Sequence, residues 1–167
     1  RPAMPRFTPG NAITLLRNGS EFFPALTRAI DRAQREVWLE TYIFADDPAG
    51  RGVAAALVRA AQRGVNVRVM VDGWGAKHYL TRKLEAMLAD GGVRLLKYRP
   101  DVAPWQFRSH RLRRLHRKLC HIDGQLAFVG GINLIDDMNT PRHKPPRLDF
   151  AVSVEGPVLG EMVQTMQ

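Results

Sequence analysis

The sequence of 167 residues predicts an α/β fold, a single layered domain over residues 1–167 with a mostly parallel mixed sheet and helices on both faces. Between residues 12 and 98, short runs rich in β-branched and aromatic residues alternate with segments whose apolar residues repeat at helical spacing. This alternation favours parallel strands joined by right-handed crossovers. The composition, 45% hydrophobic and 25% charged, is that of an ordinary globular domain.

The first part of the chain predicts four strands separated by three helices. Ser20 is placed to cap the first helix, with Pro24 in its first turn. The second strand is interrupted by Asp46, Asp47 and Pro48 before the next helical pattern begins. In chain order, the expected elements are a strand and turn at 12–19, a helix at 20–34, a strand at 37–44, a helix at 53–64, a strand at 66–73, a helix at 78–89 and a strand at 93–98.

The pattern changes after residue 98. Residues 99–114 predict an irregular basic loop, and residues 141–147 predict an exposed loop stiffened by proline. The stretches 115–123, 125–131 and 148–156 have no helix-length spacers clearly between them, so we expect adjoining strands. The chain opens at Arg1 and stops within a helix-like pattern that follows Pro157, so we expect it to be part of a longer protein.

The charge and cysteine content limit the classes of function. A formal net charge of +9 and a pI near 10.6 favour polyanionic partners, which are nucleic acid, anionic lipid surfaces or phosphorylated substrates. No apolar run approaches the roughly 18 residues of a membrane-spanning helix. The single Cys120 excludes an intramolecular disulfide and a cysteine-based metal site. The histidines outside residues 115–123 are His78, His110 and His143, and they do not have the short spacing of metal ligands in a sequence. We therefore expect no metal and no cofactor.

The stretch LHRKLCHID (115–123) carries the strongest chemical signal. In a strand, His116 and Lys118 would lie on the same face, so an imidazole and an ammonium would point the same way. A neutral imidazole can attack phosphorus while a cation stabilises the charge on the phosphoryl oxygens. For an isolated HxK, an ordinary basic surface strand would be the better interpretation.

A longer pattern distinguishes this HxK from a chance match. His116, Lys118, Asp123, Gly130, Gly131 and Asn133 together give HxK, four residues, Asp, six residues and GGxN. The pattern resembles the HKD motif of the phospholipase D superfamily, and LHRKLCHIDGQLAFVGGIN is most similar to the amino-terminal half of bacterial cardiolipin synthases. The similarity extends to GNAITLLRNG, WLETYIF, AAQRGVNVRVMVDG and DFAVSVEGPV. The resemblance implies a phospholipase D-like layered domain, the first HKD half of a two-domain protein.

The resemblance also implies roles for the residues of the motif. His116 would be the nucleophile that forms a phosphohistidine, and Lys118 and Asn133 would bind the phosphoryl oxygens. Gly130 and Gly131 would let the backbone approach the phosphate closely. Many superfamily members have serine at the position of Gly131, so a possible hydroxyl contact is lost here.

Four further residues complete the predicted site. Asp123 belongs to the motif, but strand parity places it on the face opposite His116, so we expect a structural hydrogen-bonding role. By resemblance, Asp149 would hold the imidazole of His116 in its attacking tautomer. Glu40, near the carboxyl end of an apolar strand, and Arg114, in the basic loop, are predicted to support or guide the substrate.

The function implied by the resemblance is that of a cardiolipin synthase, which condenses two phosphatidylglycerols into cardiolipin and glycerol. The expected location is peripheral, at the cytoplasmic face of the bacterial inner membrane, with anionic phospholipid as partner. Because the chain has one motif, the second must come from a missing carboxy-terminal half or from a second copy. Two alternatives stay open, a phosphodiesterase or nuclease acting as a homodimer and a silent anion-binding module, although nucleic acid is the less favoured partner.

Overall fold

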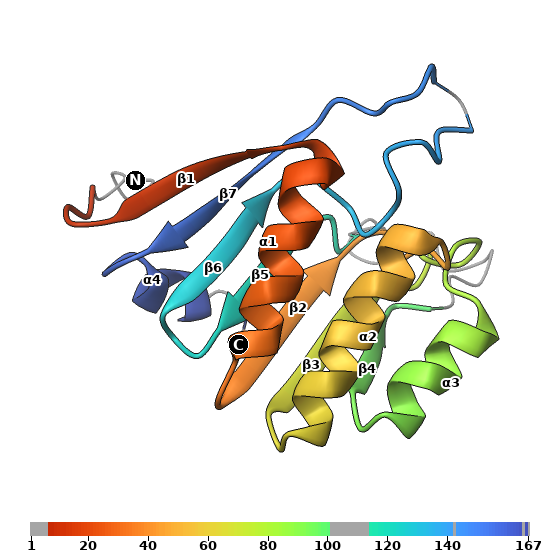
Figure 1. Cartoon of the computed structure of the whole chain (residues 1–167), viewed down its shortest axis with the longest axis horizontal. Coiled ribbons are helices and arrows are strands. Elements are labelled where there is room, and N and C mark those ends of the chain that lie inside the picture. The colour runs from red at the N-terminus through yellow and green to blue at the C-terminus, as the bar shows by residue number, and fades with distance from the viewer. Residues whose placement is uncertain (1–6, 101–113, 142, 165, 167) are drawn as a thin grey trace.

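A seven-stranded sheet in the order β1-β7-β6-β5-β2-β3-β4 forms the centre of the domain (Figure 1). The computed structural model describes residues 7–100, 114–141, 143–164 and 166. The strands are β1 (Ala12–Arg17), β2 (Glu36–Thr41), β3 (Asn66–Asp72), β4 (Arg94–Tyr98), β5 (Leu119–Ile122), β6 (Leu126–Gly130) and β7 (Phe150–Glu155). The layered α/β architecture predicted from the sequence is therefore confirmed.

The prediction of a mostly parallel sheet is wrong. Only β2 with β3 and β3 with β4 pair in parallel, whereas the other four pairings between described strands are antiparallel. The parallel pairs are those whose connections contain a crossover helix. β5 and β6 are joined by a short turn, which can connect only antiparallel neighbours.

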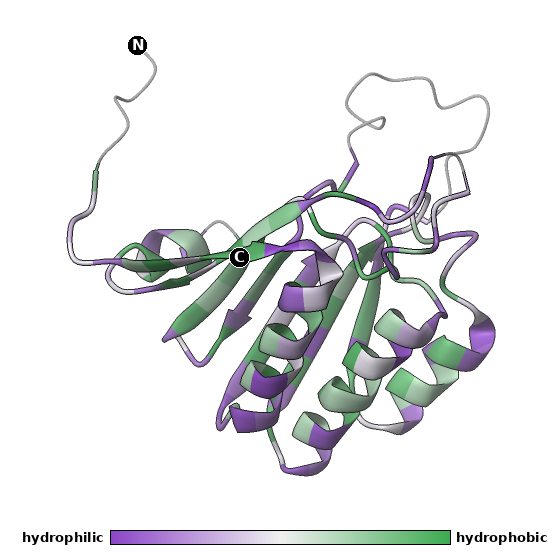
Figure 2. Cartoon of the chain, turned by 45° about the horizontal axis from the view of Figure 1, so that its top comes forward, coloured by the Kyte–Doolittle hydropathy of each residue, from purple (hydrophilic) through white to green (hydrophobic). Residues whose placement is uncertain are grey.

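Three helices cover one face of the sheet, namely α1 (Asn18–Arg32), α2 (Pro48–Gln62) and α3 (Arg82–Asp90) (Figure 1). Their buried apolar residues, such as Leu26, Leu57 and Leu84, build the main core together with residues of the strands. Figure 2 shows hydrophobic and hydrophilic residues interspersed along these helices. None of the described helices is both long and apolar enough to cross a membrane. The three helices thus cover one face of the sheet and leave the ends of the strands uncovered.

The opposite face carries a smaller cluster around the short helix α4 (Leu159–Gln164). Leu159 packs there on Leu119 and Val154, so helices do lie on both faces, although unequally. Ile13 pairs directly with Val154 across β1 and β7, which places it on this same face. Ile13 is nevertheless 66% exposed, so apolar surface remains on this face beyond α4.

Several element boundaries differ from those expected. Helix α1 begins at Asn18 instead of Ser20. The side chain of its N-cap residue Arg17 makes no capping hydrogen bond, and Oδ2 of Asp137 accepts from the first-turn amide of Gly19 at 2.8 Å. β2 ends at Thr41, because the next residues leave the ladder and bond the loop after β6: the amide of Ala45 donates to the carbonyl of Leu134 at 2.7 Å. β5 begins only at Leu119, so the motif histidine and lysine precede the strand.

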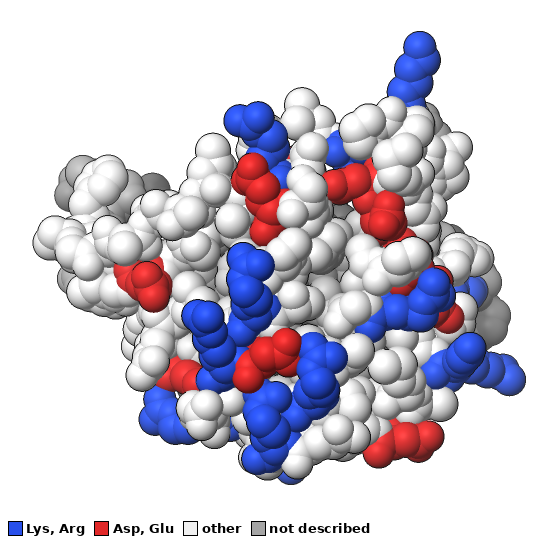
Figure 3. Space-filling view, in the orientation of Figure 1, with Lys and Arg blue, Asp and Glu red and all other residues white. Residues whose placement is uncertain are grey.

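Some of the basic side chains stabilise the packing and the ends of the helices. Figure 3 shows Lys and Arg side chains gathered around an acidic side chain near the lower ends of α1 and α2. Arg59 forms two hydrogen bonds of 2.9 Å with the carboxylate of Asp31, joining the two helices. Arg63 donates to the carbonyl of Ile30 at 3.0 Å, in the last turn of α1. A basic side chain at a helix carboxyl end is favourable, so this charge needs no anionic partner.

Asp123 is a structural residue at the turn between β5 and β6. Its carboxylate accepts hydrogen bonds of 2.8 Å from three consecutive backbone amides, those of residues 34–36. These amides lead into β2, so Asp123 fixes the start of the central strand. Although burial alone would raise the pKa of this carboxyl, the hydrogen bonds from Glu36, Gln34 and Arg35 lower it below its ordinary value.

We expect Asp123→Asn to lower the free energy of unfolding by about 1–3 kcal/mol at pH 7, since an amide replaces a charged acceptor of three hydrogen bonds. A carboxyl whose folded pKa is depressed contributes stability that is present above its unfolded pKa and lost below it. The difference from wild type should therefore shrink as the pH falls below about 4. Urea unfolding at several pH values measures this, and Asp90→Asn, which changes an exposed aspartate, is the control.

Candidate active site

His116 and Lys118 form a close pair at the end of the segment that leads into β5. The Nζ atom of Lys118 lies 3.2 Å from Nε2 of His116 and 2.8 Å from its carbonyl oxygen. When the ammonium donates to Nε2, the imidazole must be neutral with its proton on Nδ1. His116 is exposed, whereas Lys118 is partly buried. The expected adjacency is thus present, but it comes from a loop instead of strand periodicity.

Asp72 holds this loop in place. It is fully buried at the carboxyl end of β3, where Oδ1 accepts from the amides of Trp74 (3.0 Å) and Gly75 (2.8 Å). Oδ2 accepts from the amide of Leu115 at 2.8 Å, immediately before His116. Asp72 was not among the site residues predicted from the sequence. Its signal was an acidic residue at the end of an apolar strand, the position where α/β sheets place ligand groups.

Tyr42 is a second residue that the sequence analysis missed. Its ring lies 5.0 Å from the imidazole of His116, between centroids, and Nζ of Lys118 lies 5.6 Å from the same ring. A Cβ on Gly75 would lie 2.6 Å from this ring, so a glycine is required behind it. Tyr42 follows β2 directly, and it forms one wall beside the histidine–lysine pair.

Glu40 forms an ion pair with Arg117 of the motif, and it does not touch His116 in the described contacts. Its side chain is 1% exposed, and its Oε2 lies 2.7 Å from Nε of Arg117, the residue between His116 and Lys118. Burial raises the pKa of this carboxyl, while the charge and hydrogen bond of Arg117 oppose the shift. The structure therefore gives Glu40 the supporting position, and a direct contact with substrate stays a prediction.

The GGxN loop lies beside the pair. A Cβ on Gly130 would fall 2.5 Å from Cα of Ala151, so only glycine allows the loop to lie this close to β7. The Oδ1 atom of Asn133 accepts from the amide of Ile43 at 3.0 Å. This bond fixes the orientation of the side-chain amide and leaves Nδ2 as the group that could donate to a phosphoryl oxygen.

Asp149 is the residue immediately before β7, and its side chain lies beside Gly131 of the GGxN loop. Its Oδ1 lies 2.2 Å from the place that a Cβ on Gly131 would occupy, so a serine at Gly131 would displace the carboxylate. The charge of Asp149 acts on Lys118: burial lowers the pKa of that lysine, and Asp149 opposes the shift. Among the described contacts Asp149 makes no hydrogen bond with His116, so its predicted orienting role stays a prediction.

The last two predicted residues make no contact with His116 or Lys118 among the described contacts. Asp123 is at the opposite end of β5, in agreement with a structural role. Arg114 lies over Trp74, with 5.6 Å from its guanidinium carbon to the ring, and its Nη1 donates to the carbonyl of Arg99 at 3.5 Å. Residues 101–113 of the predicted basic loop (99–114) lie outside the described residues. Within the part that is described, no three His, Cys, Asp or Glu side chains are arranged to hold a metal.

The arrangement can perform nucleophilic substitution at phosphorus. It combines an exposed imidazole, an adjacent lysine and an oriented amide near the carboxyl ends of β2 and β3. These are the elements required for attack on a phosphodiester.

Comparison with known proteins identifies the family of the chain. Residues 26–143 match the family described as "Cardiolipin synthase, PLD-like domain". The chain is 41% identical over 155 residues to cardiolipin synthase B of Salmonella typhi and 37% identical to that of Escherichia coli K12, with 93% of the chain covered. It spans 37% of the length of both relatives.

Solved structures give the same fold. Nuc, a phospholipase D family member from Salmonella typhimurium, superposes with a TM-score of 0.68 at 19% identity, covering 93% of this chain and 91% of Nuc. NucT from Helicobacter pylori superposes with a TM-score of 0.65 at 14% identity, covering 94% and 92%. At these identities the likeness concerns the fold alone. The motif geometry, the sequence match and the fold together show that this chain belongs to the family of cardiolipin synthase PLD-like domains.

Proposed function

We propose that the chain provides one catalytic half of a cardiolipin synthase-type phosphatidyltransferase, which condenses two phosphatidylglycerols into cardiolipin and glycerol. The observation that carries the proposal is the exposed His116 held 3.2 Å from Lys118, in a chain of the cardiolipin synthase family. The relatives that bear this name are longer than the chain, so the proposal concerns the protein at its full length.

In the first half of the reaction, Nε2 of His116 attacks the phosphorus of one phosphatidylglycerol. The N–P bond forms as the bond from phosphorus to the glycerol oxygen breaks, and a general acid protonates the departing glycerol. Lys118 and Nδ2 of Asn133 are placed to stabilise the charge that develops on the phosphoryl oxygens. Lys118 must leave Nε2 for this attack, and an arriving phosphate offers it a stronger, charge-assisted partner.

In the second half, the hydroxyl oxygen of another phosphatidylglycerol attacks the phosphorus and the N–P bond breaks. The hydroxyl proton passes to the group that served as general acid, and His116 is restored. No second HKD motif occurs in this chain, so the acid must come from the rest of the full-length protein or from a second copy. The exposed apolar side chains Ile13, Leu15 and Phe150 offer a surface for such pairing.

The membrane contact belongs to the same proposal. The substrate is an anionic lipid, and the net charge of +9 favours a negatively charged bilayer surface. Trp74, 57% exposed, and the neighbouring Arg114 lie where an aromatic ring and a cation could meet lipid headgroups. We propose peripheral attachment at the cytoplasmic face of the inner membrane, with phosphatidylglycerol as the lipid.

Trapping of the covalent intermediate tests this function. After acid-free denaturing quench of the full-length protein with phosphatidylglycerol, we expect a phosphatidyl adduct by intact mass, together with cardiolipin among the lipids. His116→Ala should lose the adduct and reduce cardiolipin formation by at least about a thousandfold, since it removes the nucleophile. An unchanged melting temperature shows that the variant is folded.

Two results would count against this function. A folded wild-type protein that gives neither adduct nor lipid product would exclude phosphatidyl transfer. Cleavage of DNA that is lost in His116→Ala would then support the alternative phosphodiesterase activity. An adduct that persists in His116→Ala would assign the nucleophile to another residue, while leaving the transferase activity intact.

The pH dependence gives a separate prediction for Asp149. Lys118 acts as a cation, so activity should fall as the pH rises through its pKa. Burial lowers that pKa and Asp149 raises it, so Asp149→Asn should lower it further and shift the alkaline limb of kcat/KM to lower pH. A pH profile of phosphatidyl transfer measures the shift. Lys118→Arg should extend the alkaline limb upward, and an unmoved limb in both variants would show that another group controls it.

A further inference from the structure

We propose that a groove beside His116 binds the acceptor lipid, with Arg147 holding the phosphate of its phosphoglycerol headgroup. This inference rests on the proposed transferase function and adds to it the place where the second substrate lies. The groove has a volume of about 470 Å³ and lies between the residues after β2, the turn after β3 and the segment before β7. Its walls include Tyr42, Trp74, Tyr79, Thr140 and Arg147.

Tyr42 connects the groove with the catalytic pair. The same ring that lines the groove lies 5.0 Å from the imidazole of His116 and 5.6 Å from Nζ of Lys118. A headgroup bound in the groove would therefore share a wall with the nucleophile. This is the place from which an acceptor hydroxyl can reach a phosphoryl group attached to Nε2.

Arg147 supplies the charge that an anionic headgroup requires. Its guanidinium is partly buried in the wall, and its Nε is buried without a hydrogen-bond partner among the described residues. Its Nη2 donates to the carbonyl of Asn139 at 3.1 Å. The buried Nε cannot reach a ligand, but Nη1 makes no hydrogen bond among the described residues and can donate to a phosphate in the groove.

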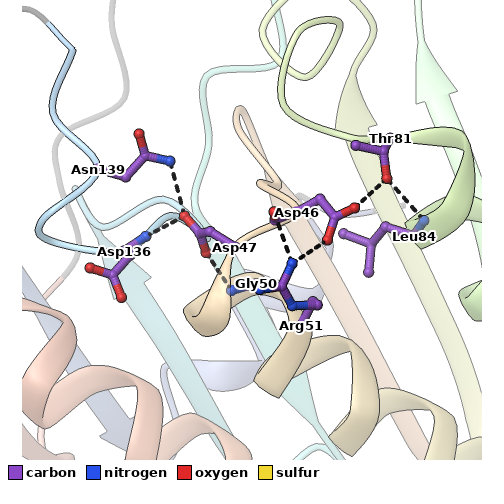
Figure 4. Close-up of polar contacts among 8 residues, drawn as sticks. All are labelled: Asp46, Asp47, Gly50, Arg51, Thr81, Leu84, Asp136 and Asn139. Atoms are coloured by element: carbon purple, nitrogen blue, oxygen red, sulfur yellow. Dashed lines mark hydrogen bonds and ion pairs between the residues drawn. The ribbon is translucent and has the colours of Figure 1, made fainter.

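The wall that carries Arg147 is fixed before any ligand arrives. Figure 4 shows Asp47 at the start of α2 joined to Asp136 and Asn139. Its Oδ1 caps the helix at Gly50 (2.9 Å), and its Oδ2 accepts from the amide of Asp136 (2.8 Å) and from Nδ2 of Asn139 (3.2 Å). The backbone carbonyl of Asn139 accepts the hydrogen bond from Arg147. The carboxylate of Asp47 therefore positions the guanidinium indirectly, through Asn139. A preorganised cation loses little entropy when it binds an anion.

The lining selects a polar anion that carries hydroxyl groups. Tyrosine, threonine and histidine side chains supply hydrogen bonds around the single cation, and no carboxylate is among the described lining residues. A phosphoglycerol headgroup has one negative charge and free hydroxyls, which matches these groups. The exposed Trp74 at the rim would contact the lipid interface.

The groove would act in the second half of the reaction. With the acceptor phosphate on Arg147, the glycerol hydroxyl attacks the phosphorus on His116, the N–P bond breaks, and the proton passes to the general base of the second motif. Water and small alcohols can attack the same intermediate without using Arg147. The fate of the intermediate therefore reports on acceptor binding separately from its formation.

The test is a partition experiment on the full-length protein, with phosphatidylglycerol vesicles and added ethanol. Cardiolipin, phosphatidylethanol and phosphatidic acid are measured together, since all three arise from one intermediate. We expect Arg147→Gln to lower the ratio of cardiolipin to phosphatidylethanol about tenfold, as loss of one charge-assisted hydrogen bond implies. Arg147→Lys should restore most of the ratio, and the ratio does not depend on how much protein is folded.

Arg94→Gln is the matched control, because it removes an exposed arginine at the start of β4 and should leave the ratio unchanged. If Arg147→Gln keeps the wild-type ratio while all three products form, the acceptor site is refuted and the transferase function stands. Equal loss in Arg94→Gln would refute it too, because general attraction to the vesicle would explain the effect. If wild type forms none of the three products, the proposed function itself fails.

Discussion

A buried carboxylate at the carboxyl end of β3 determines where His116 and Lys118, the proposed catalytic pair, lie. Asp72 bonds the amides of its own turn and the amide of Leu115, so it fixes the loop that carries His116 and Lys118 against the sheet edge. An uncompensated carboxylate in this position would be costly, and three amide donors remove that cost. The exposed histidine can therefore have a defined position although it lies outside any strand.

Charge around the pair is arranged so that each carboxylate already has its own contacts. Glu40 lies against Arg117, Asp149 lies over Gly131, and Asp123 accepts three amides at the distant end of β5. Burial lowers the pKa of Lys118 and the charge of Asp149 opposes that shift, although the two side chains form no ion pair among the described contacts. The glycine at 131 is what makes room for this carboxylate, so a serine there would alter the electrostatics of Lys118.

A single tyrosine brings the proposed donor and acceptor sites together. Tyr42 lies at the point where β2 leaves the ladder and pairs instead with the loop after β6. Asp47, five residues later, anchors the other wall of the groove. Because β2 ends early, the segment that follows it contacts His116, the GGxN loop and the groove.

The sequence by itself determined the layered α/β class and the HKD pattern, because apolar periodicity and motif spacing are local properties of the chain. It also predicted that Asp123 would be structural. Strand direction, the loop conformation of His116 and the positions of Asp72, Tyr42 and Arg147 were decided by tertiary structure alone. The physical reason is that these features depend on hydrogen bonds between residues far apart in the chain, such as that of Asp72 with Leu115, which no local pattern encodes.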